Sequence, residues 1–494
     1  MNLLIKGVQV VDGTGKEPYR ADVLIQRNII ASIGNIKEHG SAKTIEGLGN
    51  YLTPGFIDLN GEPDHHLSLF SNPEQKEFLN QGVTTVLGGQ SGSSLAPIHY
   101  GSLESIRKWA DVKEINVNWN TLEEFLEELD KLRLGINFGT LVGHSTIRRD
   151  LVKSRKTLDK EELEIMENIL KRSLDEGGFG LSSGLNFIHG KKSSLKELAE
   201  LNRVVAKMGM VHFIDLPDYG KDILKWINQI VGVVERGRAN TIINNFKPVK
   251  GYEKEFEKAL RIVESTDRLG FSISPQGVSQ IQIYTLLPEF ALKNDLISTL
   301  EEIRKPGVGK KIENYWKKSK PNYKNIRVIS APKHHFLIGR TVAEVAKNWG
   351  TTQSKALLEL MKMCELQATV THGSVPKKYL RELVTNKKAY IGSGSNGLVP
   401  GMGSASIHPA NHTFLNFIDT AVGKNKFGIE AAIKKITGDA ASLIGLSDRG
   451  LIKEGMIADL VLLDKSGKEV KEVIIGGSLV SDGTNRGEIL STRK

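Results

Sequence analysis

The chain has 494 residues, of which 39% are hydrophobic and 25% charged, and its formal net charge at pH 7 is +10. These values are typical of globular proteins with a large core and more than one structural unit. No apolar run is long enough to span a bilayer and the N-terminus lacks the layout of a cleavable signal, so we expect a cytoplasmic protein. Because Cys364 is the only cysteine, intramolecular disulfides and thiolate metal clusters are excluded.

Both ends of the chain predict short strands. β-Branched residues are broken by Gly-containing turns in residues 3–50, and the same texture returns in residues 459–481. We therefore predict one small β-sandwich domain, built from residues 1–53 and 438–494.

Between these ends, apolar runs typical of strands alternate with helical patterns. The predicted strands are 56–59, 84–87, 137–142, 178–182, 210–216, 241–245, 271–274 and 389–392, and the predicted helices include 121–134, 159–176, 194–207 and 252–269. About eight βα units indicate an α/β fold, a TIM barrel, over residues 54–437. The stretch at about 290–335 is too long for a plain crossover and predicts an insertion within the barrel.

A set of short motifs, in a fixed order along the chain, carries a resemblance to a known family. The motifs are Pro54-Gly-Phe-Ile-Asp58, Gln81-Gly-Val-Thr-Thr-Val86, Leu141-Val-Gly-His-Ser-Thr-Ile-Arg148, Gly180-Leu-Ser-Ser-Gly-Leu185 and Asp448-Arg-Gly-Leu-Ile-Lys-Glu-Gly455. Together they resemble the N-acyl-D-amino-acid deacylase (D-aminoacylase) branch of the amidohydrolase superfamily. This resemblance implies a zinc-dependent hydrolase acting on carbon–nitrogen bonds other than peptide bonds.

The resemblance also implies where the zinc ligands and the catalytic base belong, and these positions are substituted. The first His-x-His pair falls on Asn60 and Glu62, the metal-binding cysteine on Ser91, the later histidines on Asp215 and Asn245, and the catalytic aspartate on Gly394. A histidine, His212, lies three residues before Asp215. Zinc prefers nitrogen and sulfur ligands, so we expect no zinc site and a degenerate member, a pseudoenzyme.

Polar residues remain at the expected barrel mouth, the end of a TIM barrel at which working groups gather. We expect the binding residues for a small polar ligand to be Asn60, Gln90, Ser91, Asn245, Lys247 and Gln276. By the resemblance, Lys247 keeps the position of a lysine that pairs with the substrate carboxylate, whereas a substrate-binding arginine is replaced by Ala410.

Alternatives stay open for the two surviving carboxylates. In one alternative, Glu62 and Asp215 form an acid–base pair in a divergent hydrolase of non-peptide C–N bonds. This hydrolase works with or without a hard divalent metal bound by Asp58, Glu62 and Asp215. In another alternative, the same two carboxylates form salt bridges with Lys247 or hydrogen bonds within a relic pocket. The histidines His65 and His66 are expected in a surface loop.

Partners are predicted from charge alone. The basic segment 304–327 contains Trp316 and Tyr323 between its lysines, and we interpret it as a solvated surface rather than a nucleic-acid site. Neither nucleic acid nor a membrane is expected as a partner, and oligomerisation stays open.

Overall fold

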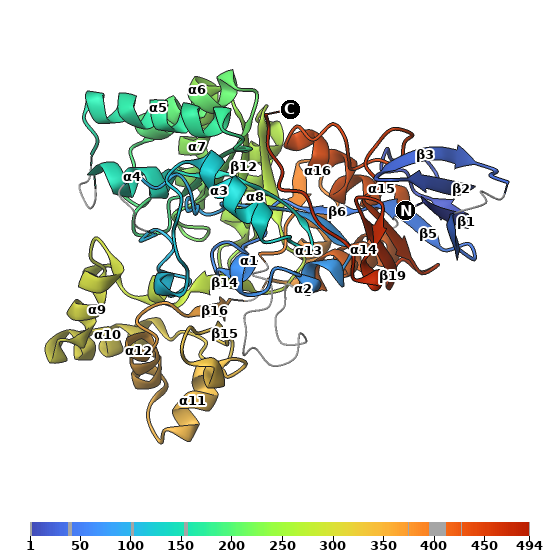
Figure 1. Ribbon diagram of the computed structural model, residues 1–494. Coiled ribbons are helices and arrows are strands. Elements are labelled where there is room, and N and C mark those ends of the chain that lie inside the picture. Colours follow the sequence, from blue (N-terminus) through green and yellow to red (C-terminus); the bar gives the residue numbers. More distant parts are fainter. Residues whose placement is uncertain are drawn as a thin grey trace.

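The computed structural model describes residues 2–37, 42–99, 103–152, 157–373, 375–394, 412–425 and 427–493. Figure 1 shows three parts: a barrel, a β-domain to one side of it that contains the N-terminal strands, and a group of helices below it. Of the helices in these ranges, none combines the length and the apolar character that a membrane span requires.

The central part is a barrel of parallel strands, which confirms the TIM-barrel prediction. The strands are β6 (Phe56–Asp58), β7 (Val83–Gly88), β8 (Asn137–Thr140), β9 (Val142–Gly143), β10 (Gly180–Gly184), β11 (Val211–Asp215), β12 (Asn240–Ile243), β13 (Leu269–Ile273) and β17 (Ala389–Ile391). Hydrogen bonds join β6, β7 and β8 in one sheet and β9 to β13 with β17 in a second. The Gly394 amide donates to the Asn60 carbonyl oxygen at 2.7 Å, which links the chain after β17 to the chain after β6.

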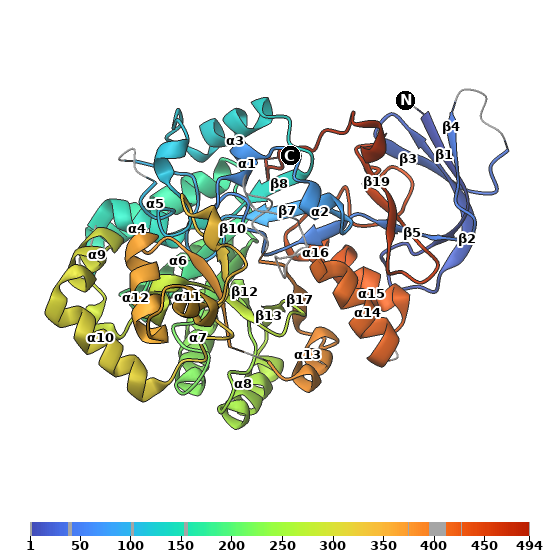
Figure 2. The same ribbon diagram turned by 90° about the horizontal axis from the view of Figure 1, so that it is seen from below.

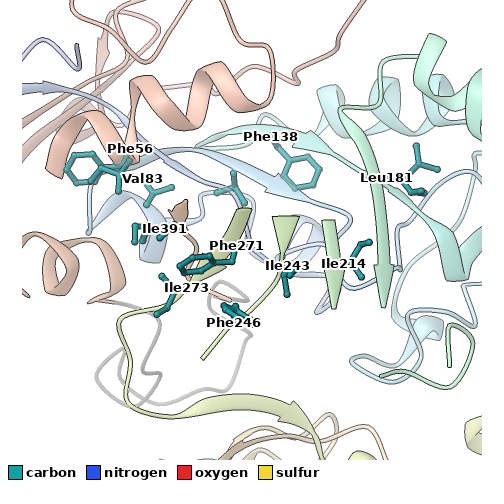
Figure 3. Packing of buried hydrophobic residues seen from close by; sticks show 14 of the residues in the cluster. Phe56, Val83, Phe138, Leu181, Ile214, Ile243, Phe246, Phe271, Ile273 and Ile391 are labelled. Atoms are coloured by element: carbon teal, nitrogen blue, oxygen red, sulfur yellow. The ribbon is translucent and has the colours of Figure 1, made fainter. Parts of the chain in front are cut away.

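The barrel strands are buried on both faces because neighbouring residues point to opposite sides of a strand. Phe56, Val86 and Ile214 pack in the large cluster beneath the surrounding helices, and Figure 3 shows Phe56 and Ile214 with other side chains of that cluster. Ile57 and Phe213, on the alternate positions, pack in a separate cluster. Because these strands are buried on both faces, their sequences are continuous apolar runs.

Helices surround the barrel and several begin with strong caps. Capping boxes start α3 (Leu122–Lys131) and α5 (Lys160–Asp175), where Thr121 and Asp159 bind the backbone three residues ahead. The other helices outside the insertion are α1 (Ser68–Ser71), α2 (Lys76–Leu79), α4 (His144–Val152), α6 (Leu195–Lys207), α7 (Ile223–Gly237), α8 (Glu253–Ser265), α13 (Lys377–Val384), α14 (Thr413–Asn425), α15 (Ile429–Ile436) and α16 (Gly438–Leu443).

The β-domain takes strands from both ends of the chain. They are β1 (Asn2–Val10), β2 (Tyr19–Gln26), β3 (Ile29–Gly34), β4 (Lys43–Glu46), β5 (Tyr51–Pro54), β18 (Leu460–Leu463), β19 (Val470–Ile475) and β20 (Ser478–Leu479). Instead of two separate sheets they form one hydrogen-bonded sheet, because β1 is irregular at Gly7 and pairs first with β4 and then with β5. The predicted domain boundaries, 1–53, 54–437 and 438–494, stay a prediction.

The chain between β13 and β17 leaves the barrel and forms a subdomain of its own. Its elements are β14 (Ser279–Gln282), α9 (Leu296–Arg304), α10 (Pro306–Ser319), β15 (Val328–Ser330), α11 (Val342–Asn348), α12 (Gln353–Met363) and β16 (Thr369–His372). Its residues from Ile283 to Val370 contribute to a separate apolar core. The insertion is therefore longer than the segment 290–335 that was expected from the sequence. Figure 2 shows its helices in front of the barrel strands.

The insertion packs on loops that follow the carboxyl ends of barrel strands. Its Ser330 hydroxyl lies 3.5 Å from His66 Nδ1, beyond β6, and its Tyr284 hydroxyl accepts from the Ile188 amide at 3.4 Å, beyond β10. The insertion therefore forms part of the rim of the barrel mouth.

A buried arginine joins the barrel to the β-domain. The Arg449 guanidinium binds Asp459 Oδ2 at 2.9 Å and Glu488 Oε2 at 2.6 Å. Asp459 directly precedes β18, and the Asn137 amide at the start of β8 donates to its Oδ2 at 2.8 Å. The Arg449–Asp459 ion pair and the hydrogen bond from the Asn137 side chain to Asp459 thus connect the two parts at their boundary.

We predict that Arg449→Met lowers the free energy of unfolding by about 3–5 kcal/mol, because it leaves the Asp459 carboxylate buried without its counter-charge. Urea unfolding measures this loss. Arg486→Met is the control, since it removes an exposed pair with Asp130 and should cost less than about 1 kcal/mol. Equal losses in the two variants would contradict the role given to Arg449.

Candidate functional site

Asp58 ties the end of β6 to the end of β17. The backbone amides of Asn60 and Ser393 each donate to Asp58 Oδ1 at 3.0 Å, and the Ser393 hydroxyl donates to Oδ2. A Cβ atom on Gly392 would lie 2.5 Å from the Asn60 Cβ, so a larger residue would push the two strand ends apart. Burial raises the pKa of Asp58, and these hydrogen bonds oppose the rise. Both oxygens of Asp58 are therefore engaged in closing the barrel.

Gln90 and Asn244 form a buried amide pair beneath the mouth. Gln90 Nε2 donates to the Leu59 carbonyl oxygen at 2.6 Å, and its Oε1 accepts from Asn244 Nδ2 at 3.1 Å. Asn244 Oδ1 accepts in turn from the Ser272 hydroxyl at 3.0 Å. The chain that follows β6, β7 and β12 is thus cross-linked to β13, and Gln90 has an internal structural role in addition to any contact with a ligand.

Asp215 lies at the end of β11 and collects side-chain donors from two other strand ends. Asn244 Nδ2 lies 3.4 Å from its Oδ2, and the side chains of Ser91 and Asn245 also donate to the carboxylate. Burial raises the pKa of Asp215 to about 6, against the effects of these donors and of Lys108. The structure brings Ser91, Asn245 and Asp215 together as expected, and adds Asn244, which the sequence analysis did not single out.

Glu62 is the second carboxyl group of the mouth and is partly buried. Burial, followed by the negative charges of Asp215, Asp64 and Asp58, raises the pKa of Glu62 to about 8, and the positive charge of Lys108 opposes the rise. Glu62 is therefore mostly protonated at neutral pH, whereas Asp215 is mostly ionised. The two carboxyl groups differ in charge state although they interact.

Lys247 is buried after β12, and only 4% of its surface is exposed. Its ammonium group donates to the Val278 carbonyl oxygen at 3.1 Å, and burial lowers its pKa to about 8. Among the described residues, Lys247 forms no ion pair with Glu62 or Asp215, so the salt-bridge form of that alternative is wrong. Its hydrogen-bonded form agrees with the contacts of Asp215. A buried ammonium with one backbone acceptor retains donors for a ligand.

Gln276 lies after β13 and donates through Nε2 to the Thr413 hydroxyl at the start of α14, at 2.5 Å. It is half-buried, as expected for a residue that lines the mouth. Ala410, at the position of the missing arginine, lies outside the described residues.

Lys108 is a buried lysine that the sequence analysis missed, and burial lowers its pKa well below the ordinary value. Its ammonium group donates to the Ser93 hydroxyl at 2.8 Å and to the Ser105 carbonyl oxygen at 2.6 Å. It also lies 3.9 Å from the centre of the Trp109 ring, on which the His65 ring is stacked at 4.0 Å. The only available signal was a lysine directly before a tryptophan in an irregular segment, which is a weak one.

The prediction that His65 and His66 lie in a surface loop is wrong. His65 is fully buried: its Nε2 lies 2.9 Å from the Ser93 carbonyl oxygen, and its stacking on Trp109 holds the ring inward. His66 is 6% exposed and lines a cavity of about 150 Å³ at the boundary with the insertion. The insertion covers this loop, which is why a sequence of loop character is buried.

The histidine beside Asp215 belongs to the barrel wall. His212 Nδ1 lies 3.0 Å from the Asn202 amide of α6, and its Nε2 lies 2.9 Å from the Ser183 hydroxyl. Because residues 212 and 215 differ by an odd number, their side chains point to opposite faces of β11. Burial lowers the pKa of His212 to about 3, so the ring is neutral and replaces no lost ligand.

The side chains at the mouth do not fit a zinc ion. In the ranges that the structure describes, no three His, Cys, Asp or Glu side chains are grouped so that they hold a metal. The positions examined carry amide, hydroxyl and carboxyl groups, whereas protein zinc sites use imidazole or thiolate with at most some carboxylate. In the alternative set for a hard metal, Asp58 is already bound to Ser393 and is not grouped with Glu62 and Asp215.

The basic segment 304–327 forms α10 and the turn after it. Lys310 and Lys317 line a surface groove of about 390 Å³ together with Lys355 of α12. Trp316, by contrast, is 1% exposed and packs into the core of the insertion. The aromatic residue thus has a structural role, and the absence of nucleic-acid and membrane partners stays a prediction, as does a cytoplasmic location.

Comparisons with known proteins find deacylases among the proteins that are similar to this chain. No protein-family model matches the chain. Two proteins of Alcaligenes xylosoxydans xylosoxydans are similar over 94% of it: an N-acyl-D-glutamate deacylase, 25% identical over 87% of its own length, and a D-aminoacylase, 24% identical over 88%.

Solved structures show the same fold. An N-acyl-D-glutamate deacylase from Bordetella bronchiseptica, complexed with zinc and a phosphonate inhibitor, superimposes with a TM-score of 0.80 at 21% identity, over 99% of both chains. A D-aminoacylase does so with a TM-score of 0.75 at 22% identity, again over 99% of both chains. The chain therefore resembles, along nearly its whole length, the D-aminoacylase branch of the amidohydrolase superfamily, as its motifs predicted.

Proposed function

We propose that this protein binds a small carboxylate ligand at the barrel mouth and does not carry out zinc-dependent deacylation. The observation that supports this most directly is the hydrogen bonding of the side chains at the mouth. Asp58, Gln90 and Asp215 are bound by neighbouring side chains or backbone amides of the described chain, and their donor set does not suit zinc. Such a site holds its shape without a metal.

Lys247 supplies the recognition of the ligand. A buried ammonium group is costly unless a counter-charge arrives, and a ligand carboxylate provides that charge together with hydrogen-bond acceptors. Two of the similar proteins are named for N-acyl-D-glutamate and N-acyl-D-aspartate, which carry carboxylates. We take N-acetyl-D-glutamate as the probe for this ligand class.

We predict that calorimetric titration detects N-acetyl-D-glutamate binding to the protein, and that the ligand is recovered intact. Lys247→Met should weaken this binding at least tenfold, because a hydrogen bond to a charged group contributes about 1.5–3 kcal/mol. Lys250→Met is the matched control, since that lysine is exposed three residues further along and should leave affinity unchanged. Unaltered affinity in Lys247→Met, or release of acetate by the unmodified protein, would reject the proposal.

A second candidate is metal-independent hydrolysis of a non-peptide C–N bond by Glu62 and Asp215. One observation favours it: the pKa of Glu62 is about 8 and that of Asp215 about 6, so near pH 7 one is a proton donor and the other a proton acceptor. Pairs of carboxyl groups whose environments separate their pKa values are suited to general acid–base catalysis.

This charge state predicts a pH dependence of stability. Because the folded pKa of Glu62, about 8, lies above its unfolded value of 4.5, Glu62 contributes stability at low pH that is lost as the pH rises through 8. Thermal unfolding of Glu62→Gln, compared with the unmodified protein, should show a melting-temperature difference that shifts in favour of the variant between pH 5 and pH 9. A constant difference over this range would mean that Glu62 is ionised throughout, and would remove the proton donor of the second candidate.

A further inference from the structure

We propose that the groove between α10 and α12 of the insertion binds an acidic peptide segment of a partner protein. All residues that line this groove belong to the insertion. The surface is therefore separate from the barrel mouth, and its occupation does not depend on the ligand proposed there.

Two amphipathic helices form the groove, and Figure 2 shows them side by side. On α10, Ile312 and Trp316 point into the apolar core of the insertion, as Leu357 does on α12. The helices meet at the base of the groove, where a Cβ atom on Gly309 would lie 3.2 Å from Leu358 Cδ2. Because Gly309 has no side chain, the helices approach closely here, and the groove of about 390 Å³ lies above this contact.

Lysines stand on both sides of the groove with a spacing of seven residues. Lys310 and Lys317 belong to α10, and Lys355 and Lys362 belong to α12. Seven residues rise about 10 Å along an α-helix and complete nearly two turns, so both lysines of a pair lie on one face. The groove thus presents two rows of ammonium groups, one on each side.

Most of this positive charge is not neutralised by the protein. Lys310, Lys317 and Lys355 are exposed, and they form no ion pair with any residue that the structure describes. Lys362 pairs with Glu359 at 3.0 Å. In total, five lysines and two glutamates line the groove. Like charges held around one groove repel one another and attract an anionic ligand, which removes this repulsion when it binds.

The lining favours a peptide over a nucleic acid. Single-stranded nucleic acids bind through bases that stack on aromatic rings. No aromatic side chain of the described chain lines the groove, because Trp316 is 1% exposed and Tyr315 packs edge-on against Phe290. Glu313 and Glu359 repel a continuous row of phosphates, whereas a peptide places a neutral or basic residue opposite each of them.

The spacing of the lysines also suits a peptide. An extended chain rises about 3.3 Å per residue, so acidic residues three positions apart match the separation of the two lysines in one row. The partner segment that we infer is therefore an extended peptide with repeated acidic residues.

Fluorescence anisotropy of a fluorescein-labelled ten-residue polyglutamate, titrated with the full-length protein, tests this binding. Charge repulsion keeps such a probe extended. We expect saturable binding at about 150 mM NaCl, where the Debye length is about 8 Å and only nearby charges contribute strongly. The double variant Lys310→Glu/Lys355→Glu should weaken this binding at least tenfold, because each substitution replaces an attraction within the groove by a repulsion.

Lys311→Glu/Lys318→Glu is the matched control. These two lysines are exposed on α10, each one residue beyond a lysine of the groove, and they do not line it. The control changes the net charge equally and should alter affinity by less than about threefold, since its charges are screened from the groove. All four lysines are exposed, so neither double variant disturbs the core.

Three results would overturn the assignment. The first is the absence of saturable binding of the peptide. The second is an equal loss of affinity in the two double variants, which would mean that only net charge matters. The third is tighter binding of a ten-nucleotide oligothymidylate than of the peptide, which would identify a nucleic-acid site instead.

Discussion

Carboxyl groups buried at the mouth of this barrel require donors or a positive charge, and the mouth is arranged to supply them. Asp58 receives the amides of Asn60 and Ser393, and thereby closes the barrel between its first and last strands. Asp215 receives side chains from the chain that follows β12 and from the chain that follows β7. Removing carboxylates from water costs several kcal/mol unless such partners are present, so these contacts set which strand ends can lie together.

The insertion also packs against the segment that follows β7. In this segment the Lys108 ammonium group donates to the Ser93 hydroxyl, and Trp109 packs in the apolar core of the insertion. Polar contacts and apolar packing therefore meet in one short stretch of chain. In the zinc-bearing deacylase of known structure the fold is shared, whereas in this chain oxygen and amide groups stand at the positions where the family resemblance implies metal ligands.

Much of the fold could be predicted from the sequence because it depends on local patterns. Strand periodicity and capping residues are local signals, because they depend on residues that are close together in the sequence. The expected strand 210–216, for example, matches β11, Val211–Asp215. Burial that results from packing against a segment distant in the sequence leaves no such local pattern. The loop containing His65 and His66 has the composition of a surface loop, and it is buried because a segment more than 200 residues later packs on it.

The site was predictable only where it lies on strands. Glu62, Ser91 and Asp215 follow strands with clear patterns, so the shared geometry of a parallel barrel places them at one end. Asn244 and Asn245 are adjacent, and the sequence alone does not decide which of their side chains lies towards Asp215. Lys108 lies in an irregular segment, and no local pattern indicates that its ammonium group is buried against the Ser93 hydroxyl and the Ser105 carbonyl oxygen.

The barrel mouth is proposed to be stable and complete without zinc. A crystal structure of the protein grown in excess zinc chloride, with anomalous differences measured at the zinc absorption edge, tests this most directly. We predict no anomalous peak among Asn60, Glu62, Ser91 and Asp215. A peak there, bound by three or more protein atoms at about 2.0–2.3 Å, would contradict the account.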